Sequence, residues 1–227
     1  MKDILNNLTN TDLGNNVFKL FEKTSLITNG VFVDLGVRGG TSSEIMLIDS
    51  EKLNNKVFGV DVDFSVLDDK IKNNSNYKCI LGDSVTIGKN WTSPINGLFV
   101  DTFHIKEQVM MELYYWYPHM VEGGFIAFHD TNWPKGKYDY YGGIMWDRVE
   151  EGIKDFFNIK TLNYEDEYIV SNNYPESWGM TIIEIKKKNN YIESYNKWDG
   201  VFNKRNHLIS LFWNEHNKGD INIELLI

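Results

Sequence analysis

Residues 31–48, VFVDLGVRGGTSSEIMLI, join a short apolar run to a helical pattern through a glycine-rich turn. β-branched and aromatic residues dominate the run Val31–Leu35, which predicts a buried strand. Thr41 and Glu44 stand at the spacing of a capping box before an apolar run, so we expect a helix to begin there. A strand, a turn of glycines and a helix together form a cradle in which a small molecule can lie against the backbone.

The alternation of strand-like and helix-like patterns continues along the chain, which is typical of βαβ units around a parallel sheet. Two late runs, Tyr168–Val170 and Met180–Ile185, are close enough in sequence to pair as an antiparallel ribbon. The segment from about Asn189 to Ile227 does not continue the βα pattern. Further buried strands are expected at Val57–Val62, Tyr77–Leu81, Gly97–Val100 and Phe125–His129, and helices over Ile105–Trp116 and Met145–Phe156.

Length and composition exclude several classes of protein. A chain of 227 residues fits one medium-sized domain. The net charge of -9 and a pI near 5.1 argue against a nucleic-acid-binding surface, which needs clustered Lys and Arg. A single cysteine, Cys79, rules out an intramolecular disulfide, and no apolar run reaches membrane-spanning length. With a first segment too polar for a signal peptide, the sequence predicts a soluble, cytoplasmic protein.

The glycine turn departs from the G-x-G-x-x-G pattern of a dinucleotide-binding loop. Val37 and Arg38 follow Gly36, so the second glycine, which lets a pyrophosphate approach the backbone, is missing. Asp34 instead places a carboxylate at the end of the strand. A carboxylate there suits a ligand with an ammonium group or hydroxyls and repels a pyrophosphate, so a nucleotide-binding oxidoreductase is an alternative that the turn disfavours.

Two more acids end the next predicted strands. Asp61 lies at the end of the second strand, where a carboxylate can accept hydrogen bonds from both hydroxyls of a ribose. Asp83 follows the third strand and can accept a hydrogen bond from an adenine amino group. The sequence Gly-Asp-Ser is, however, also common in ordinary turns. Acids at three successive strand ends predict a ligand that contains an amino-acid group, a ribose and an adenine.

These motifs resemble the first motifs of class I S-adenosylmethionine-dependent methyltransferases. The later runs VDTFH, residues 100–104, and GGFIAFHDT, residues 123–131, are similar to one branch of them, which contains sugar and macrolide O-methyltransferases and cephalosporin-hydroxylase-like proteins. The resemblance extends from about Val31 to Ile185. It implies a Rossmann-like three-layer α/β sandwich with a mostly parallel seven-stranded sheet, whose last strands form the antiparallel ribbon.

The resemblance also implies a division of the chain and a cofactor site. Residues 1–188 would form the methyltransferase domain, with a helical cap over about 1–29, and residues 189–227 an extension that acts as a lid or an oligomer contact. S-adenosylmethionine would lie with its methionine half on the glycine turn, its ribose on Asp61 and its adenine on the following strand end. The residues expected to bind the cofactor are Asp34, Gly36, Gly40, Ser42, Asp61, Asp83 and Ser84.

The chemical end of the predicted site contains two more strand-end acids, Asp101 and Asp130. Parallel neighbouring strands bring such carboxylates to one edge of the sheet, where two oxygen ligands suit Mg²⁺. In metal-dependent relatives a pair of acids follows the fifth strand, but here His129 occupies the first place of that pair. We therefore expect Asp101, Asp130 and His129 to surround a metal position, with Mg²⁺ itself left open.

A sugar hydroxyl needs a general base or a cation that lowers its pKa before it can attack a sulfonium. Some sugar-modifying relatives have an acid at the place of Phe103, so His104 is the candidate base, beside Asp101 as a catalytic residue. The alternative for His104 is that it caps the following helix. The predicted function is O-methylation of a sugar, glycoside or other small-molecule hydroxyl. A non-catalytic, methyltransferase-like partner subunit is the alternative, and association between copies of the chain is left open.

An aromatic loop follows Asp130 and is expected at the same edge of the sheet. Such loops commonly supply substrate contacts. Its aromatic residues could stack on an acceptor ring, or they could roof the site or pack in a subunit contact. They are Trp133, Tyr138, Tyr140 and Tyr141, before a possible hinge at Gly142 and Gly143.

Overall fold

The computed structural model describes residues 2–133 and 148–216. One eight-stranded sheet runs through these parts in the order β3-β2-β1-β4-β5-β8-β7-β6. The first five strands in the chain are mutually parallel, and β8, β7 and β6 continue the sheet antiparallel from β5. The strands are β1 (Val31–Leu35), β2 (Lys56–Asp61), β3 (Tyr77–Leu81), β4 (Ile95–Val100), β5 (Met120–His129), β6 (Tyr164–Glu165), β7 (Ile169–Tyr174) and β8 (Met180–Ile185).

The α/β fold expected from the sequence is confirmed, with one more strand than expected. The ribbon of β7 and β8 pairs antiparallel, as the two late apolar runs predicted. The extra strand, β6, has two residues and pairs only with β7 at the edge of the sheet. A strand of two residues has no room for an alternating pattern, so periodicity could not reveal it.

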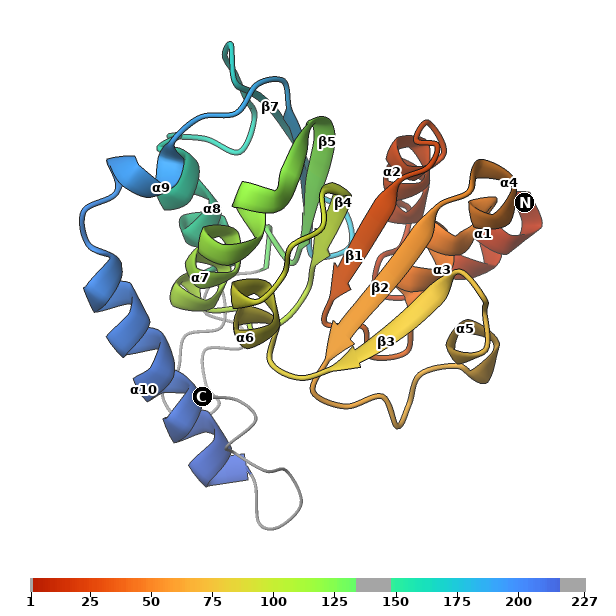
Figure 1. Cartoon of the computed structure of the whole chain (residues 1–227), viewed down its shortest axis with the longest axis horizontal. Coiled ribbons are helices and arrows are strands. Elements are labelled where there is room, and N and C mark those ends of the chain that lie inside the picture. Colours follow the sequence, from red (N-terminus) through yellow and green to blue (C-terminus); the bar gives the residue numbers. More distant parts are fainter. Residues whose placement is uncertain (1, 134–147, 217–227) are drawn as a thin grey trace.

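Helices cover both faces of the sheet (Figure 1). Buried residues of α1, α2, α3 and α5 pack on one face, and those of α7, α8 and α9 pack on the other, with α6 beside α7. The helices are α1 (Lys2–Leu8), α2 (Asn16–Thr24), α3 (Thr41–Leu47), α4 (Ser50–Leu53), α5 (Asp69–Lys72), α6 (Ser84–Lys89), α7 (Lys106–Trp116), the 3₁₀ turn η1 (Tyr117–His119), α8 (Val149–Phe157), α9 (Tyr191–Ser194) and α10 (Trp198–His216).

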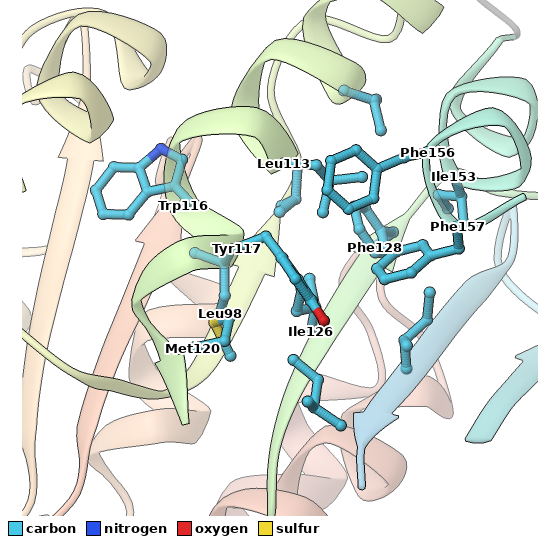
Figure 2. Packing of buried hydrophobic residues seen from close by; sticks show 14 of the residues in the cluster. Leu98, Leu113, Trp116, Tyr117, Met120, Ile126, Phe128, Ile153, Phe156 and Phe157 are labelled. Atoms are coloured by element: carbon cyan, nitrogen blue, oxygen red, sulfur yellow. The ribbon is translucent and has the colours of Figure 1, made fainter. Parts of the chain in front are cut away.

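Alternation along the central strands divides the core into two layers. Leu98 of β4 and Ile126 and Phe128 of β5 face α7 and α8, where they meet Leu113 and Phe156 (Figure 2). The intervening residues of the same strands belong to the opposite cluster, beneath α2 and α3. Because both faces are buried, the strands are apolar at nearly every position, and this fixes their register and the place of their carboxyl ends.

The start of α3 differs from the expected capping box. Gly40 is the N-cap residue, with a φ of 91°, and no side chain caps the helix there. The amide of Glu44 donates to the carbonyl of Gly40 at 2.8 Å, so Thr41 is already the first helical residue. The capping-box prediction was wrong, because the left-handed glycine begins the helix one residue earlier than the Thr-x-x-Glu spacing indicates.

The segment after β8 forms α9 and α10. Figure 1 shows α10 running along the outside of α7, next to α6. Val201 and Phe202 of α10 pack against Met110, Met111 and Val85. In the two described parts of the chain, no helix combines the length and the apolar character needed to cross a membrane.

Candidate functional site

Two cavities lie at the carboxyl ends of β1, β2, β4 and β5 and share part of their lining. The first, here the β2 cavity, measures about 250 Å³, and the second, here the β5 cavity, about 350 Å³. The residues common to both are Gly36, Arg38, Asp101 and Thr102. The β2 cavity is further lined by Val60–Val62, Gly82–Ser84, Phe103, Gln108 and Ile209, and the β5 cavity by Asp12, Leu13, Val37, Gly39–Ser42, Phe99, His104, His129, Asp130, Trp133 and Trp178.

The glycine turn after β1 forms the floor where the two cavities meet. Gly36 has a φ of 84°, and a Cβ there would lie 2.0 Å from the carbonyl oxygen of Asp101. Only glycine therefore lets the ends of β1 and β4 approach this closely. The next residues turn so that the amide of Arg38, itself at a φ of 48°, donates to Asp61 at 2.9 Å.

Asp34 lies beneath this turn and lines neither cavity. Its carboxylate is fully buried, and one oxygen accepts from the hydroxyls of Ser42 and Ser43 at 2.7 and 2.5 Å. Burial raises the pKa of Asp34 to about 7, although both serine hydrogen bonds favour the ionised form. Its other oxygen has no hydrogen-bond partner among the described residues. Asp34 thus ties the start of α3 to β1, and direct contact with a ligand stays a prediction for it.

Asp61 lies at the lip of the β2 cavity, as expected for the end of β2. One of its oxygens accepts from the amide of Arg38, and the other accepts from the amide of Asp63 at 3.1 Å. These backbone donors orient the carboxylate while the side chain remains partly exposed. The arrangement fits a group that accepts hydrogen bonds from a bound ligand.

Asp83 and Ser84 also line the β2 cavity, but they have additional partners that the sequence did not indicate. Asp83 is the N-cap of α6 and forms a buried ion pair with Arg205 of α10. The hydroxyl of Ser84 donates to Glu112 at 2.5 Å. Neither Arg205 nor Glu112 belongs to a strand-end motif, so no local pattern could have identified them.

At the far side of the glycine turn, four side chains gather around one point of the β5 cavity. Nε2 of His104 lies 3.1 Å from a carboxylate oxygen of Asp101 and 3.1 Å from one of Asp130. Nδ1 of His129 lies 3.3 Å from the other oxygen of each acid. The structure therefore brings together all four residues that the sequence assigned to the catalytic and metal positions.

The protonation of His129 follows from what surrounds its ring. Its Nε2 lies 3.1 Å from the carbonyl oxygen of Ser177, which requires a proton on that nitrogen. A neutral ring would then turn the lone pair of Nδ1 toward two carboxylates. Burial disfavours the charged ring, but the carboxylates of Asp101 and Asp130 outweigh it and raise the pKa of His129 to about 9.

The two acids of this cluster are held differently. Burial raises the pKa of Asp130 to about 6, with the negative charge of Asp101 adding to the effect. The pKa of Asp101 is lowered despite burial, because the imidazoles of His104 and His129 lie beside its carboxylate and stabilise the charged form. Burial opposes the charge of His104, but Asp101 and Asp130 raise its pKa as well. The site thus contains one firmly ionised carboxylate between two basic rings.

The donor set fits a divalent cation. One ligand atom each from Asp101, His104 and Asp130 lies within 4.8 Å of the others. Two buried atoms beside them, Nδ1 of His129 and one oxygen of Asp130, have no aligned hydrogen-bond partner among the described residues. Carboxylate oxygens suit Mg²⁺, whereas imidazole nitrogens suit transition metals better.

Aromatic rings form one wall of the β5 cavity. The ring of Trp133 lies 5.9 Å from that of His104 and stacks on Trp178, with centroids 4.8 Å apart and planes inclined by 30°. Trp178 comes from the β7–β8 connection, which the sequence did not indicate as part of the site. The expected contacts of Tyr138, Tyr140 and Tyr141, and the hinge at Gly142–Gly143, lie outside the described residues.

Comparison with solved structures finds the same fold in several methyltransferases. The S-adenosylhomocysteine-bound methyltransferase PaMTH1 of Podospora anserina is 13% identical, with a TM-score of 0.56 over 75% of this chain and 77% of that one. An O-methyltransferase-like protein of Klebsiella pneumoniae is 13% identical, with a TM-score of 0.58 over 81% and 90%. MycE of the mycinamycin biosynthetic pathway, in complex with Mg and S-adenosylhomocysteine, is 18% identical, with a TM-score of 0.52 over 81% and 55%.

The sequence gives the same result at the level of the domain. Residues 33–131, from β1 to just past β5, match a family model described as a methyltransferase domain. No curated protein matches the chain by sequence. The family match over these residues and the fold shared with solved methyltransferases both agree with the resemblance of the motifs.

Proposed function

We propose that the protein is an S-adenosylmethionine-dependent methyltransferase that methylates a hydroxyl group of a sugar or another small molecule, with a divalent cation such as Mg²⁺ at the acidic cluster. The observation that carries the proposal is the meeting of the two cavities above Gly36 and Asp101. One cavity has the lining of a nucleoside pocket, and the other contains the acid–imidazole cluster. A methyl donor that spans the glycine turn would end beside that cluster.

The β2 cavity supports the cofactor assignment. When bound, S-adenosylmethionine would supply an electrophilic methyl group on a sulfonium. Asp61 would accept the ribose hydroxyls, and Gly36 and Gly40 would let the methionine half pass close to the backbone. Asp34 would act from below by fixing Ser42 and the start of α3. The acidic surroundings favour a cationic donor over a phosphate-bearing one.

The β5 cavity supports a hydroxyl acceptor. His104 lies beside both acids, which raise the pKa of its ring, so the neutral form of His104 would be a strong base for the proton of an acceptor hydroxyl. Asp101, Asp130 and His129 would hold the cation, which would lower the pKa of that hydroxyl. Trp133 and Trp178 would exclude water on one side and present flat apolar faces to a ring.

Titration calorimetry with S-adenosylhomocysteine tests the cofactor assignment, and we expect saturable one-to-one binding. Release of S-adenosylhomocysteine during incubation with a panel of sugars, glycosides and catechols tests the reaction. Activity should fall when EDTA is added and return with excess Mg²⁺ or Mn²⁺.

Each outcome tests a different part of the proposal. No binding of S-adenosylhomocysteine at millimolar concentration would remove the cofactor. Binding without turnover on any acceptor would favour a non-catalytic partner subunit, and activity indifferent to EDTA would remove the cation. Quenching of NADH fluorescence instead would point to an oxidoreductase, which the glycine turn disfavours.

A further inference from the structure

The C-terminal helix α10 reaches the β2 cavity, although the methyltransferase family match ends at residue 131. Ile209 lines the cavity and is 6% exposed, and Arg205, one helical turn before it, is 2% exposed. Residues four apart lie on the same side of a helix. One side of α10 therefore faces the pocket that the proposed function assigns to the nucleoside.

Arg205 connects α10 to both elements that form the inner wall of this pocket. Its guanidinium pairs with the carboxylate of Asp83 at the start of α6, and its Nε donates to Oε1 of Gln108 in α7 at 2.8 Å. The amide nitrogen of Gln108 in turn donates to Ser84 at 3.0 Å and to Glu112 at 2.8 Å. A buried cation with these partners holds α6, α7 and α10 at fixed distances from one another.

These contacts limit the role that Asp83 can have in binding a ligand. One carboxylate oxygen accepts from the amide and the hydroxyl of Thr86, at 2.9 and 3.0 Å, and the other faces Arg205. Both oxygens are thus engaged before any ligand binds. The remaining lining of the β2 cavity is rich in apolar residues, namely Val60, Val62, Phe103 and Ile209. Such a lining suits the face of a flat ring.

We propose that α10 is the closing wall of the nucleoside pocket, where Ile209 packs on the base and Arg205 is a positioning residue that holds the wall in place through Asp83 and Gln108. The inference rests on the proposed function and deepens it, because it assigns part of the segment after residue 188 to the cofactor site. It also gives Asp83 the task of anchoring α10 rather than accepting from the base.

Calorimetric titration of the full chain with S-adenosylhomocysteine tests the inference. Ile209→Asn should weaken binding about tenfold, because a polar group replaces apolar packing against the base. Arg205→Gln should weaken it to a similar extent, and Arg205→Lys should restore part of the affinity. The loss should also appear with adenosine as the probe, since α10 faces the nucleoside end.

Lys204→Met is the matched control. Lys204 lies on the same helix and pairs with Glu107 of α7 at 2.6 Å, but its side chain is 51% exposed and does not line the cavity. We expect its affinity for S-adenosylhomocysteine to stay within about twofold of the wild type, because neither Lys204 nor Glu107 lines the β2 cavity. Circular dichroism melts identify variants that fold, and Ile209→Ala serves if Ile209→Asn does not.

The outcomes distinguish the proposed function from the role of α10. Failure of the wild-type chain to bind S-adenosylhomocysteine would overturn the proposed function and this inference with it. Wild-type binding together with unchanged affinity in a folded Ile209 variant would overturn the inference alone. Hydrogen exchange that slows in residues 198–210 on ligand addition, and less so in the Ile209 variant, would support it.

Discussion

Nε2 of His104 lies 3.1 Å from a carboxylate oxygen of Asp101 and 3.1 Å from one of Asp130, the two acids of the β5 cavity. Replacing His104 by glutamine keeps a polar side chain of similar size but removes the basic ring. We expect His104→Gln to lower kcat by roughly 10²-fold or more, the usual contribution of a general base. Its affinity for S-adenosylhomocysteine should be unchanged, because His104 does not line the β2 cavity.

Steady-state kinetics with an accepted substrate, together with calorimetry, measure these two effects separately. His119→Gln is a suitable control, because His119 lies in η1, just after the C-terminal end of α7, and lines neither cavity. Equal loss of kcat in both variants, or undiminished kcat in His104→Gln, would contradict the role of base.

Glu112 gives a prediction on stability and pH. It is fully buried, and one oxygen accepts from Ser84, Thr102 and Gln108 at 2.5, 2.7 and 2.8 Å. Burial nevertheless raises its pKa to about 7. Between its unfolded pKa near 4.5 and about 7, the folded state binds the proton more tightly than the unfolded state, so this group's contribution to stability falls as the pH rises.

Glu112→Gln mimics the protonated group at every pH. We expect the free energy of unfolding of the wild type to fall relative to that of Glu112→Gln from pH 4.5 to pH 7.5, by up to about 1.4 kcal/mol for each unit of pKa shift. Urea titrations of both proteins across this range provide the measurement. A constant difference between them would show that the Glu112 pKa is not raised in the folded protein.

At the scale of single elements, the glycine turn offers a paired test. Gly36→Ala would force a side chain into a φ of 84°, with its Cβ 2.0 Å from the carbonyl oxygen of Asp101. The left-handed backbone alone costs about 1–2 kcal/mol for a residue with a Cβ, and the contact adds to it. We expect a clear loss of thermal stability in the unliganded protein.

Gly39→Ala is the control for this turn. A Cβ at Gly39 would meet nothing within 4 Å. We expect its melting temperature to stay close to that of the wild type, because no atom must move. If the two variants melted alike, the close approach of β1 and β4 at Gly36 would not be what requires glycine there.

At the scale of the whole molecule, a ligand bound in the cavities should stabilise the folded protein against unfolding. A ligand at a hundredfold excess over its Kd adds about 2.7 kcal/mol to the free energy of unfolding. For a chain of this size that corresponds to a rise in Tm of about 5–10 °C. Scanning calorimetry with and without S-adenosylhomocysteine measures the rise, and its absence at saturating ligand would contradict the assignment of the β2 cavity.

A divalent cation should act on the same scale through the acidic cluster. We expect Mg²⁺ or Mn²⁺ to raise the Tm, because it would neutralise the carboxylates of Asp101 and Asp130, whose ligand atoms lie within 4.8 Å of each other. Asp130→Asn should abolish this increment and leave the increment from S-adenosylhomocysteine intact. An equal cation effect in the variant would place the ion elsewhere.

The prediction from sequence succeeded where the pattern is local. β1, β3 and β8 have the expected ends, and the acids that follow the parallel strands do lie at one edge of the sheet. Apolar runs of five or six residues with two buried faces leave little freedom in register, and the carboxyl ends of parallel strands must then meet. The cluster of Asp101, His104, His129 and Asp130 follows from the same rule.

Only the tertiary structure decided what lies around these strand ends. It gave Asp83 and Gln108 a common partner in Arg205, brought Trp178 beside Trp133, and put Asp34 under the turn rather than in a cavity. Each of these contacts joins segments that are far apart in the chain or depends on which way one buried side chain turns. The sequence by itself therefore determined the sheet and the edge that carries the site, because periodicity and strand ends are local properties. The closure of the cavities depends on packing across the whole fold, which no local pattern records.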